Sequence, residues 1–175
     1  MTPTGKPALR AHLRAARNGM HNATLPVWPH FLDRLASGLT VATYLPILGE
    51  ADPAPLHEAA RASGCHLALP QLTTRTAPMR FAGWTAQLTA GPFGPQPADA
   101  AIVTPDIIIT PLVGFDRRGN RLGQGGGHYD RAFATYPHAW RIGIAWSVQE
   151  VDALLPDPWD VPLHAIATEQ EWITP

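Results

Sequence analysis

The sequence predicts an α/β fold: a mostly parallel central sheet with helices on both faces, in a single three-layer domain over residues 1–175. Three observations support this prediction. Strand-like and helix-like segments alternate along the chain. The strand-like segments are nearly continuous in apolar residues, as in strands that are buried on both faces. The length of 175 residues allows a sizeable core, and no repeat or linker divides the chain.

Apolar residues at helical spacing predict the helices. They are expected over residues 7–20, 29–39, 53–63 and 129–136. The third has a proline in its first turn and Gly64 after its end, which is the usual order of these residues around a helix. The residues expected to face inward are Leu9, Leu13, Ala16 and Met20 in the first helix, and Phe31, Leu32, Leu35 and Leu39 in the second.

Short apolar runs between these helices predict the strands. They are expected over residues 41–45, 66–69, 107–111, 141–146 and 165–168, with 107–111 in the centre. Residues 79–84 and 87–88 are expected to form a hairpin or an edge pair. Residues 91–104 are rich in Pro and Gly, which favours a loop. Ligands of such sheets bind beyond the carboxyl ends of the strands, so we expect the site at the loops after Leu45 and Val113.

Composition excludes several classes of protein. Hydrophobic residues make up 45% of the chain and charged residues 15%, which is typical of a folded domain. The net charge of −1 argues against a general nucleic-acid binder. The single Cys65 excludes an internal disulfide, no apolar run has membrane-spanning length, and the first residues lack the apolar core of a secretory signal. We therefore expect a cytoplasmic protein.

The most informative motif is the glycine-rich run of residues 119–127, in which five of nine residues are glycine. It follows a buried-strand pattern and precedes a helical one. Backbone N–H groups in such a loop can form an anion site, to which the helix start adds positive potential. Arg121 and Arg131 add positive charge, and Asp130 offers an oxygen ligand for Mg²⁺. The pattern indicates a phosphate site, and the alternative is a tight turn.

This run matches neither common nucleotide motif. It lacks the Lys-Ser/Thr end of a Walker A loop. It also lacks the downstream acidic residue of a dinucleotide-binding fingerprint.

The stretch from Pro111 to Asp116 and on through Arg121 to Arg131 resembles the signature of the 5-formyltetrahydrofolate cyclo-ligases, also called methenyltetrahydrofolate synthetases. Other blocks follow in the family's order, so the resemblance spans nearly the whole chain. They are Lys6-Pro7-Ala8-Leu9-Arg10, Tyr44-Leu45-Pro46, Gly49-Glu50-Ala51-Asp52, Leu69-Pro70, Met79-Arg80-Phe81, Phe93-Gly94, Pro97, Gly143-Ile144-Ala145, Gln149 and Leu155-Pro156-Asp157-Pro158-Trp159-Asp160.

The resemblance implies an enzyme that uses ATP and Mg²⁺ to cyclise 5-formyltetrahydrofolate to 5,10-methenyltetrahydrofolate, releasing ADP and phosphate. Phosphoryl transfer to the formyl oxygen would create a leaving group, and N10 of the substrate would then attack. Such an enzyme needs a small-molecule substrate, no nucleic acid and no membrane, as a monomer or homodimer.

The resemblance also implies roles for individual residues. Lys6 and Arg121 would be catalytic, and Asp130 and Asp160 would hold the metal. The substrate would contact Tyr44, Glu50, Phe115 and Tyr129. ATP would be bound by Lys6, Arg10, Arg121, Leu122, Gly123, Gln124, Gly125, Gly126, Gly127, His128 and Tyr129.

Each role has a simpler alternative in the residues themselves. Lys6, Arg10, Arg14 and Arg17 fall on one helical stripe, which composition alone assigns to a solvated basic face; the resemblance changes this for Lys6 and Arg10 only. By the same token, Tyr44 and Phe115 fit core positions, Glu50 fits a surface acid, and Asp116 and Asp160 fit turn residues.

Two departures from the family pattern leave other functions open. Gln96 stands where the family usually has Glu, and His128 where it has Tyr or Phe. If these changes abolish turnover, the chain is a non-catalytic folate- or nucleotide-binding regulator. A third possibility is an ATP-dependent enzyme for another small substrate, because the phosphate loop defines the nucleotide end better than the substrate end.

Overall fold

The computed structural model describes residues 5–85 and 87–175. Its helical elements are α1 (Lys6–Arg17), η1 (Asn18–Met20), α2 (Pro29–Leu32), α3 (Ala54–Ala62), α4 (His128–Thr135) and η2 (Ser147–Gln149). Its strands are β1 (Thr40–Ala42), β2 (His66–Gln71), β3 (Arg80–Gly83), β4 (Leu88–Gly91), β5 (Gly94–Pro97), β6 (Ile102–Val103), β7 (Ile107–Pro111), β8 (Gly114–Phe115), β9 (Arg121–Leu122), β10 (Trp140–Ile144), β11 (Ala165–Ala167) and β12 (Trp172–Ile173). Within these residues, no helix is long and apolar enough to cross a membrane.

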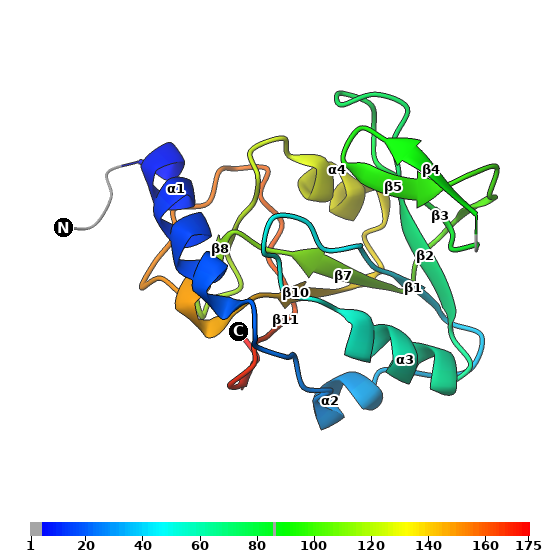
Figure 1. Ribbon diagram of the computed structural model, residues 1–175, viewed down its shortest axis with the longest axis horizontal. Helices are drawn as coiled ribbons and strands as arrows, with labels where there is room; N and C mark the ends of the chain where they lie inside the picture. The colour runs from blue at the N-terminus through cyan, green and yellow to red at the C-terminus, as the bar shows by residue number, and fades with distance from the viewer. Residues whose placement is uncertain (1–4, 86) are drawn as a thin grey trace.

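The central sheet has eight strands in the order β12-β11-β10-β7-β1-β2-β3-β6. The pairs from β11 to β2 are parallel, and β12, β3 and β6 add antiparallel edges. Helices lie on both faces, with α2 and α3 on one side of the sheet and α4 on the other (Figure 1). The predicted mostly parallel α/β fold is confirmed.

Alternating side chains of β7 explain the layers. Ile107 and Ile109 pack with Phe31 of α2 and Leu56 of α3, whereas Ile108 packs with the cluster that includes α4. All three isoleucines are at most 2% exposed, so this strand is buried on both faces and reads as a continuous apolar run. Helix α1 lies apart from these layers and packs through Leu13 against the β8–β9 hairpin (Figure 1).

Two predictions for the first third of the chain are wrong in detail. The helix expected over 29–39 ends at Leu32, and Leu32, which was expected to face inward, is 44% exposed. Arg17, predicted on a solvated basic face, is only 1% exposed. It lies at the end of α1, where the 47–50 turn packs against it, and a helical stripe does not reveal that distant segment.

The predicted loop over 91–104 contains ordered strands. β4 and β5 form a separate two-stranded antiparallel hairpin, and β6 pairs with β3. β3 therefore pairs with β2 and β6, not with residues 87–88. Pro95 and Pro97 are tolerated because β5 pairs on one side only, as an edge strand.

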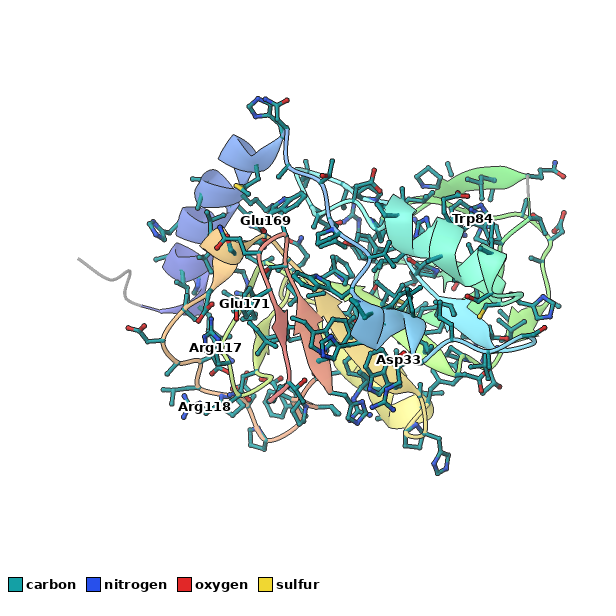
Figure 2. All side chains as sticks on the ribbon, turned by 90° about the horizontal axis from the view of Figure 1, so that it is seen from below. Asp33, Trp84, Arg117, Arg118, Glu169 and Glu171 are labelled. Atoms are coloured by element: carbon teal, nitrogen blue, oxygen red, sulfur yellow. The ribbon has the colours of Figure 1, made fainter. Side chains whose placement is uncertain are left out.

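Ion pairs tie the carboxyl-terminal strand to the rest of the protein. Arg117 pairs with Glu150 at 2.6 Å and also with Glu171, next to β12. Figure 2 shows Arg117 and Glu171 close together, and the Arg117 side chain is 55% exposed. Exposed pairs of this kind contribute little stability individually. These residues lie outside the pocket described next.

Candidate active site

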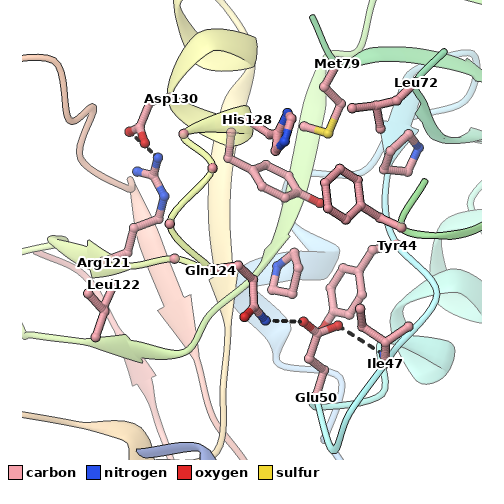
Figure 3. A pocket seen from close by; sticks show the side chains of 18 of the residues that line it. Tyr44, Ile47, Glu50, Leu72, Met79, Arg121, Leu122, Gln124, His128 and Asp130 are labelled. Atoms are coloured by element: carbon pink, nitrogen blue, oxygen red, sulfur yellow. Dashed lines mark hydrogen bonds and ion pairs between the residues drawn. The ribbon is translucent and has the colours of Figure 1, made fainter. Parts of the chain in front are cut away.

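A pocket of about 350 Å³ lies at the carboxyl ends of β1 and β7, where the sequence predicts the ligand site. The segment after β1, the end of β2, the β4–β5 hairpin and the chain from β9 into α4 form its walls. Lys6 and Asp160, from opposite ends of the chain, both line it. Arg121 and Asp130 lie on one side, and Leu72 and Met79 lie across from them (Figure 3). The pocket thus has a charged end and an apolar end.

The glycine loop lies between β9 and α4, and all of its residues from Gly123 to Gly127 line the pocket. Gly127 is the N-cap of α4 with φ of 65°, a conformation that residues with a side chain rarely adopt. No side chain caps the first turn of α4, so its N–H groups remain available to an anion. Arg10 donates from Nε to the Gly123 carbonyl at 2.8 Å, which holds α1 against the loop.

Arg121 and Asp130 form an ion pair inside the pocket (Figure 3). Their side chains are 6% and 19% exposed. Val161 links both, because its carbonyl accepts from Arg121 Nη1 at 2.5 Å and its N–H donates to Asp130 Oδ1 at 3.2 Å. The Arg121 guanidinium also lies 4.6 Å from the ring centre of Phe133. Packing and pairing thus fix the position of the Arg121 guanidinium.

Lys6 is held by a carboxylate that sequence reasoning assigned no role. Its Nζ lies 2.5 Å from Asp157 Oδ2. The backbone N–H of Asp157 in turn donates to Asp160 Oδ2 at 2.8 Å. Asp160 therefore forms a local turn while also lining the pocket, so its two interpretations are compatible. Asp157 could have been identified from the sequence by its place in the same motif, three residues before Asp160.

The apolar end combines aromatic and aliphatic side chains. Tyr44, Leu72, Met79, Phe93 and Tyr129 line it. Tyr44 is 4% exposed and donates from its hydroxyl to the Ala51 carbonyl at 2.5 Å. Burial raises the pKa values of the Tyr44 and Tyr129 hydroxyls, so both remain neutral donors. A flat, apolar ligand with polar edges fits such a wall.

Glu50 is the acidic group of this end. Its Oε2 accepts from the Ile47 N–H at 3.1 Å, and its Oε1 accepts from Gln124 Nε2 at 3.3 Å (Figure 3). Burial raises the pKa of the carboxyl, while the Ile47 hydrogen bond and the charge of Arg17 oppose this rise. Glu50 is thus a positioned carboxylate in a partly apolar wall, not a freely solvated surface acid.

The predicted contact of Phe115 with the substrate does not agree with the structure. Its side chain is fully buried in the core with Ile108 and Phe133, and it does not line the pocket. β8 directs the Phe115 side chain into the core, which confirms the alternative prediction of a core position. The other residues predicted to bind ATP, substrate or metal all line the pocket. Asp116 is a turn residue, as predicted, and accepts from the N–H groups of Arg118 and Asn120.

Both departures from the family pattern lie at the pocket. Gln96 Oε1 accepts from the Leu72 N–H at 3.0 Å, a bond that a Glu would also make, so the change removes charge without removing this contact. His128 contacts Phe93 edge-to-face at 5.0 Å between ring centres, as an aromatic residue would. Its pKa is lowered by burial and by Arg131, which favours the neutral ring.

The carboxylates of the charged end suit a metal ion that arrives with phosphates. Among the described residues, no group of three or more His, Cys, Asp or Glu could hold a metal ion on its own. Asp130 and Asp160 nevertheless both line the charged end. Mg²⁺ commonly binds one or two carboxylates together with phosphate oxygens and water. The donor set therefore fits such an ion.

Taken together, the fold and pocket describe an α/β protein with a cavity in which a glycine loop and charged side chains form one end and apolar side chains form the other. A family model described as the 5-formyltetrahydrofolate cyclo-ligase family matches residues 3–169. The chain belongs to this family, and its activity is that of an ATP-dependent ligase acting on 5-formyltetrahydrofolate in one-carbon metabolism.

Individual relatives agree. The chain is 35% identical to the 5-formyltetrahydrofolate cyclo-ligase of Escherichia coli strain K12 over 147 residues, covering 76% of this chain and 81% of that protein. The Mycolicibacterium smegmatis enzyme is 29% identical, with 99% of this chain and 98% of that protein covered. The solution structure of Aquifex aeolicus 5,10-methenyltetrahydrofolate synthetase matches with a TM-score of 0.77 and 29% identity, over 97% of this chain and 92% of that chain.

Proposed function

We propose that this pocket carries out the complete cyclisation, with ATP phosphates at the charged end and the pterin of 5-formyltetrahydrofolate at the apolar end. The observation that carries the proposal is the meeting of both ends in one cavity, with the glycine loop and Glu50 joined through Gln124. Because the cavity draws on residues from Lys6 to Asp160, we also propose that the chain acts as one domain. We further propose that it acts as a monomer or a homodimer.

The reaction needs a good leaving group on the formyl carbon. Transfer of the γ-phosphoryl group to the formyl oxygen forms a P–O bond and releases ADP. N10 then attacks the formyl carbon, phosphate leaves with the oxygen, and N10 loses its proton. Because both reacting groups belong to one substrate, alignment supplies much of the rate. The protein's tasks are to align, to neutralise charge and to exclude water.

At the charged end, each cation has a defined task. Arg10 and Lys6 come from the start of α1 and neutralise phosphate charge beside the glycine loop. Arg121 is held by Asp130 and Val161 near the transferred group, where it stabilises developing negative charge. Bound Mg²⁺ supplies further charge neutralisation, with Asp130 and Asp160 as its protein ligands, directly or through water.

At the apolar end, Glu50 accepts paired hydrogen bonds from the amino-pyrimidine edge of the pterin. Tyr44 and Tyr129 contact the flat faces of the ligand. Gln124 reaches from the glycine loop to Glu50, so it lies between the two ends of the pocket.

The direct test mixes purified protein with ATP, Mg²⁺ and 5-formyltetrahydrofolate and follows the near-ultraviolet absorbance of the methenyl product. We expect the band to appear only with ATP. A folded protein that binds ATP and gives no band would contradict the proposal. Binding of 5-formyltetrahydrofolate without turnover would then favour a regulator, and no binding would favour another substrate.

A further inference from the structure

Arg17 is a buried cation with incomplete hydrogen bonding. At 1% exposure it is among the largest fully buried side chains. Its Nε donates to the Leu48 carbonyl at 3.0 Å, and its Nη1 donates to the Leu112 carbonyl at 3.5 Å. Its Nη2 is buried without a hydrogen-bond partner among the described residues. A buried charge with an unpaired donor is costly unless an opposite charge compensates it.

Both carbonyls belong to segments that form the pocket. Leu48 lies in the turn over 47–50, which closes through the Glu50 N–H and the Ile47 carbonyl at 3.0 Å. Leu48 has φ of 51°, a strained value for a residue with a branched side chain. The hydrogen bond from Arg17 therefore adds a contact to a strained turn, and this turn carries Glu50.

The second carbonyl anchors Arg17 to the sheet. Leu112 follows β7 directly, and its carbonyl also accepts from Gln149 Nε2 at 2.7 Å. Gln149 is fully buried and donates as well to the Val113 carbonyl at 3.0 Å. Arg17 thus connects the Glu50 turn to a rigid point at the end of the central strand.

We infer that Arg17 is a positioning residue for Glu50: it ties the 47–50 turn to the end of β7 and so holds the Glu50 carboxylate in place in the pocket wall. The inference rests on the proposed role of Glu50 in binding the pterin. It assigns Arg17 no contact with substrate.

The groups around Glu50 make Arg17 the relevant cation. Tyr44 approaches from the end of β1 and Tyr129 from α4, and both are neutral. Gln124 approaches from the glycine loop as a neutral donor. Burial raises the pKa of Glu50, and Arg17 is the cation that lowers it. Asp52 raises the pKa of Tyr44, and Arg14, which donates to the side-chain oxygen of Gln124, lowers the pKa of Arg17.

Removing Arg17 should therefore change the pKa of Glu50 in a predictable direction. The pKa of Glu50 rises further, so the carboxylate is lost at a higher pH as the solution is acidified. Binding of 5-formyltetrahydrofolate needs the ionised form, so the acidic limb of its pH profile moves to higher pH. A purely structural role would lower the amount of folded protein and leave this limb unchanged.

The test compares Arg17→Met, which removes charge and donors, with Arg17→Lys, which keeps the charge. Arg34→Met is the matched control, because Arg34 is exposed and stacks on Trp140, away from the pocket. Affinity for 5-formyltetrahydrofolate is measured by titration calorimetry from pH 5 to pH 8, and KM is measured for both substrates. Thermal unfolding verifies that each variant is folded.

We expect Arg17→Met to weaken 5-formyltetrahydrofolate binding about tenfold or more, to leave the KM for ATP within about twofold, and to shift the acidic limb upward. Arg17→Lys should keep the wild-type limb and still raise the KM for 5-formyltetrahydrofolate. In an Arg17→Met, Glu50→Gln double variant, the loss should not exceed that of Glu50→Gln alone.

Equal losses for both substrates with an unmoved acidic limb would overturn the inference. If Arg17→Met does not fold, a wild-type KM in folded Arg17→Lys would also overturn it. Folded wild-type protein that does not bind 5-formyltetrahydrofolate would reject the proposed function itself, and this role with it.

Discussion

Asp116→Asn is expected to destabilise the protein by about 3 kcal/mol, although it changes one atom. The carboxylate is fully buried and accepts four hydrogen bonds. Its Oδ1 accepts from the N–H groups of Arg118 and Asn120 at 3.0 and 3.1 Å. Its Oδ2 accepts from Asn120 Nδ2 and from the Leu154 N–H, both at 2.9 Å.

The magnitude follows from this arrangement. At the Oδ1 position the NH₂ group of an asparagine faces the N–H groups of Arg118 and Asn120. At the Oδ2 position it faces the Leu154 N–H and the Asn120 side-chain amide, which can flip to accept from it. In either orientation at least one hydrogen bond to a carboxylate is lost and a buried N–H is left unpaired, which together cost about 3 kcal/mol. For a chain of this size such a loss lowers Tm by roughly 6–12 °C.

Urea unfolding followed by tryptophan fluorescence measures the free energy of unfolding of both proteins. Asp152→Asn is the control, because Asp152 is exposed and has no hydrogen bond or ion pair in the part of the chain that the structure describes. That variant should stay within about 0.5 kcal/mol of wild type. A loss below about 1 kcal/mol in Asp116→Asn, at an unchanged m-value, would refute the reasoning.

The same residue predicts a pH dependence. Burial alone would raise the pKa of Asp116, but the hydrogen bonds from Asn120, Leu154 and Arg118 outweigh it and lower the pKa below 3.8. The stabilisation is therefore complete above the unfolded-state pKa and is lost as the pH falls through the lower folded-state pKa. The difference in the free energy of unfolding between wild type and Asp116→Asn should be constant from neutral pH to about pH 5, and it should become smaller below pH 4.

Three further predictions concern the pocket. Gly125→Ala should raise the KM for ATP about tenfold, because φ of 107° is strained for alanine. Glu50→Gln should lower kcat/KM for 5-formyltetrahydrofolate by about 10²-fold. It should also flatten the acidic limb of the pH profile, because wild-type activity falls as the pH falls through the raised pKa of Glu50. Asp130→Asn should lower turnover and the affinity for Mg²⁺–ATP about 10- to 100-fold and leave the fold intact.

Each of these has its own control. Gly123→Ala serves for the loop, because a Cβ there meets nothing within 4 Å, and equal effects of the two alanines would contradict the strain argument. For Glu50→Gln, steady-state kinetics should give an unchanged KM for ATP. An equal rise in the KM values for ATP and 5-formyltetrahydrofolate would contradict the binding of the two substrates at different ends of the pocket. Unchanged activity of Asp130→Asn across a Mg²⁺ titration would contradict its metal role.

Local patterns were sufficient for most of the sheet. The run Ile107–Pro111 is a central strand because three adjacent isoleucines can be buried only between two layers of helices. The glycine loop was equally visible, since closely spaced glycines after such a strand have few structural alternatives. The correspondence of ordered blocks then indicated the family, which the comparisons confirm.

Distant contacts decided the rest. The pair of Lys6 with Asp157 joins residues 151 positions apart, and a helical stripe says nothing of such a partner. The same stripe placed Arg17 in solvent, yet the 47–50 turn and the end of β7 enclose it. Phe115 shows the converse, since its motif lies beside the pocket while β8 turns its ring into the core.

The division has a physical cause. Hydrophobic periodicity and glycine spacing act over a few residues, so the sequence by itself determined the main parallel strands, most helices and the place of the glycine loop. Which side chains are buried, paired or exposed depends on segments that meet only after the sheet has formed. The tertiary structure alone therefore decided the position of Glu50 and the shift of its pKa, because the burial that raises this pKa and the charge of Arg17 that lowers it come from different parts of the chain.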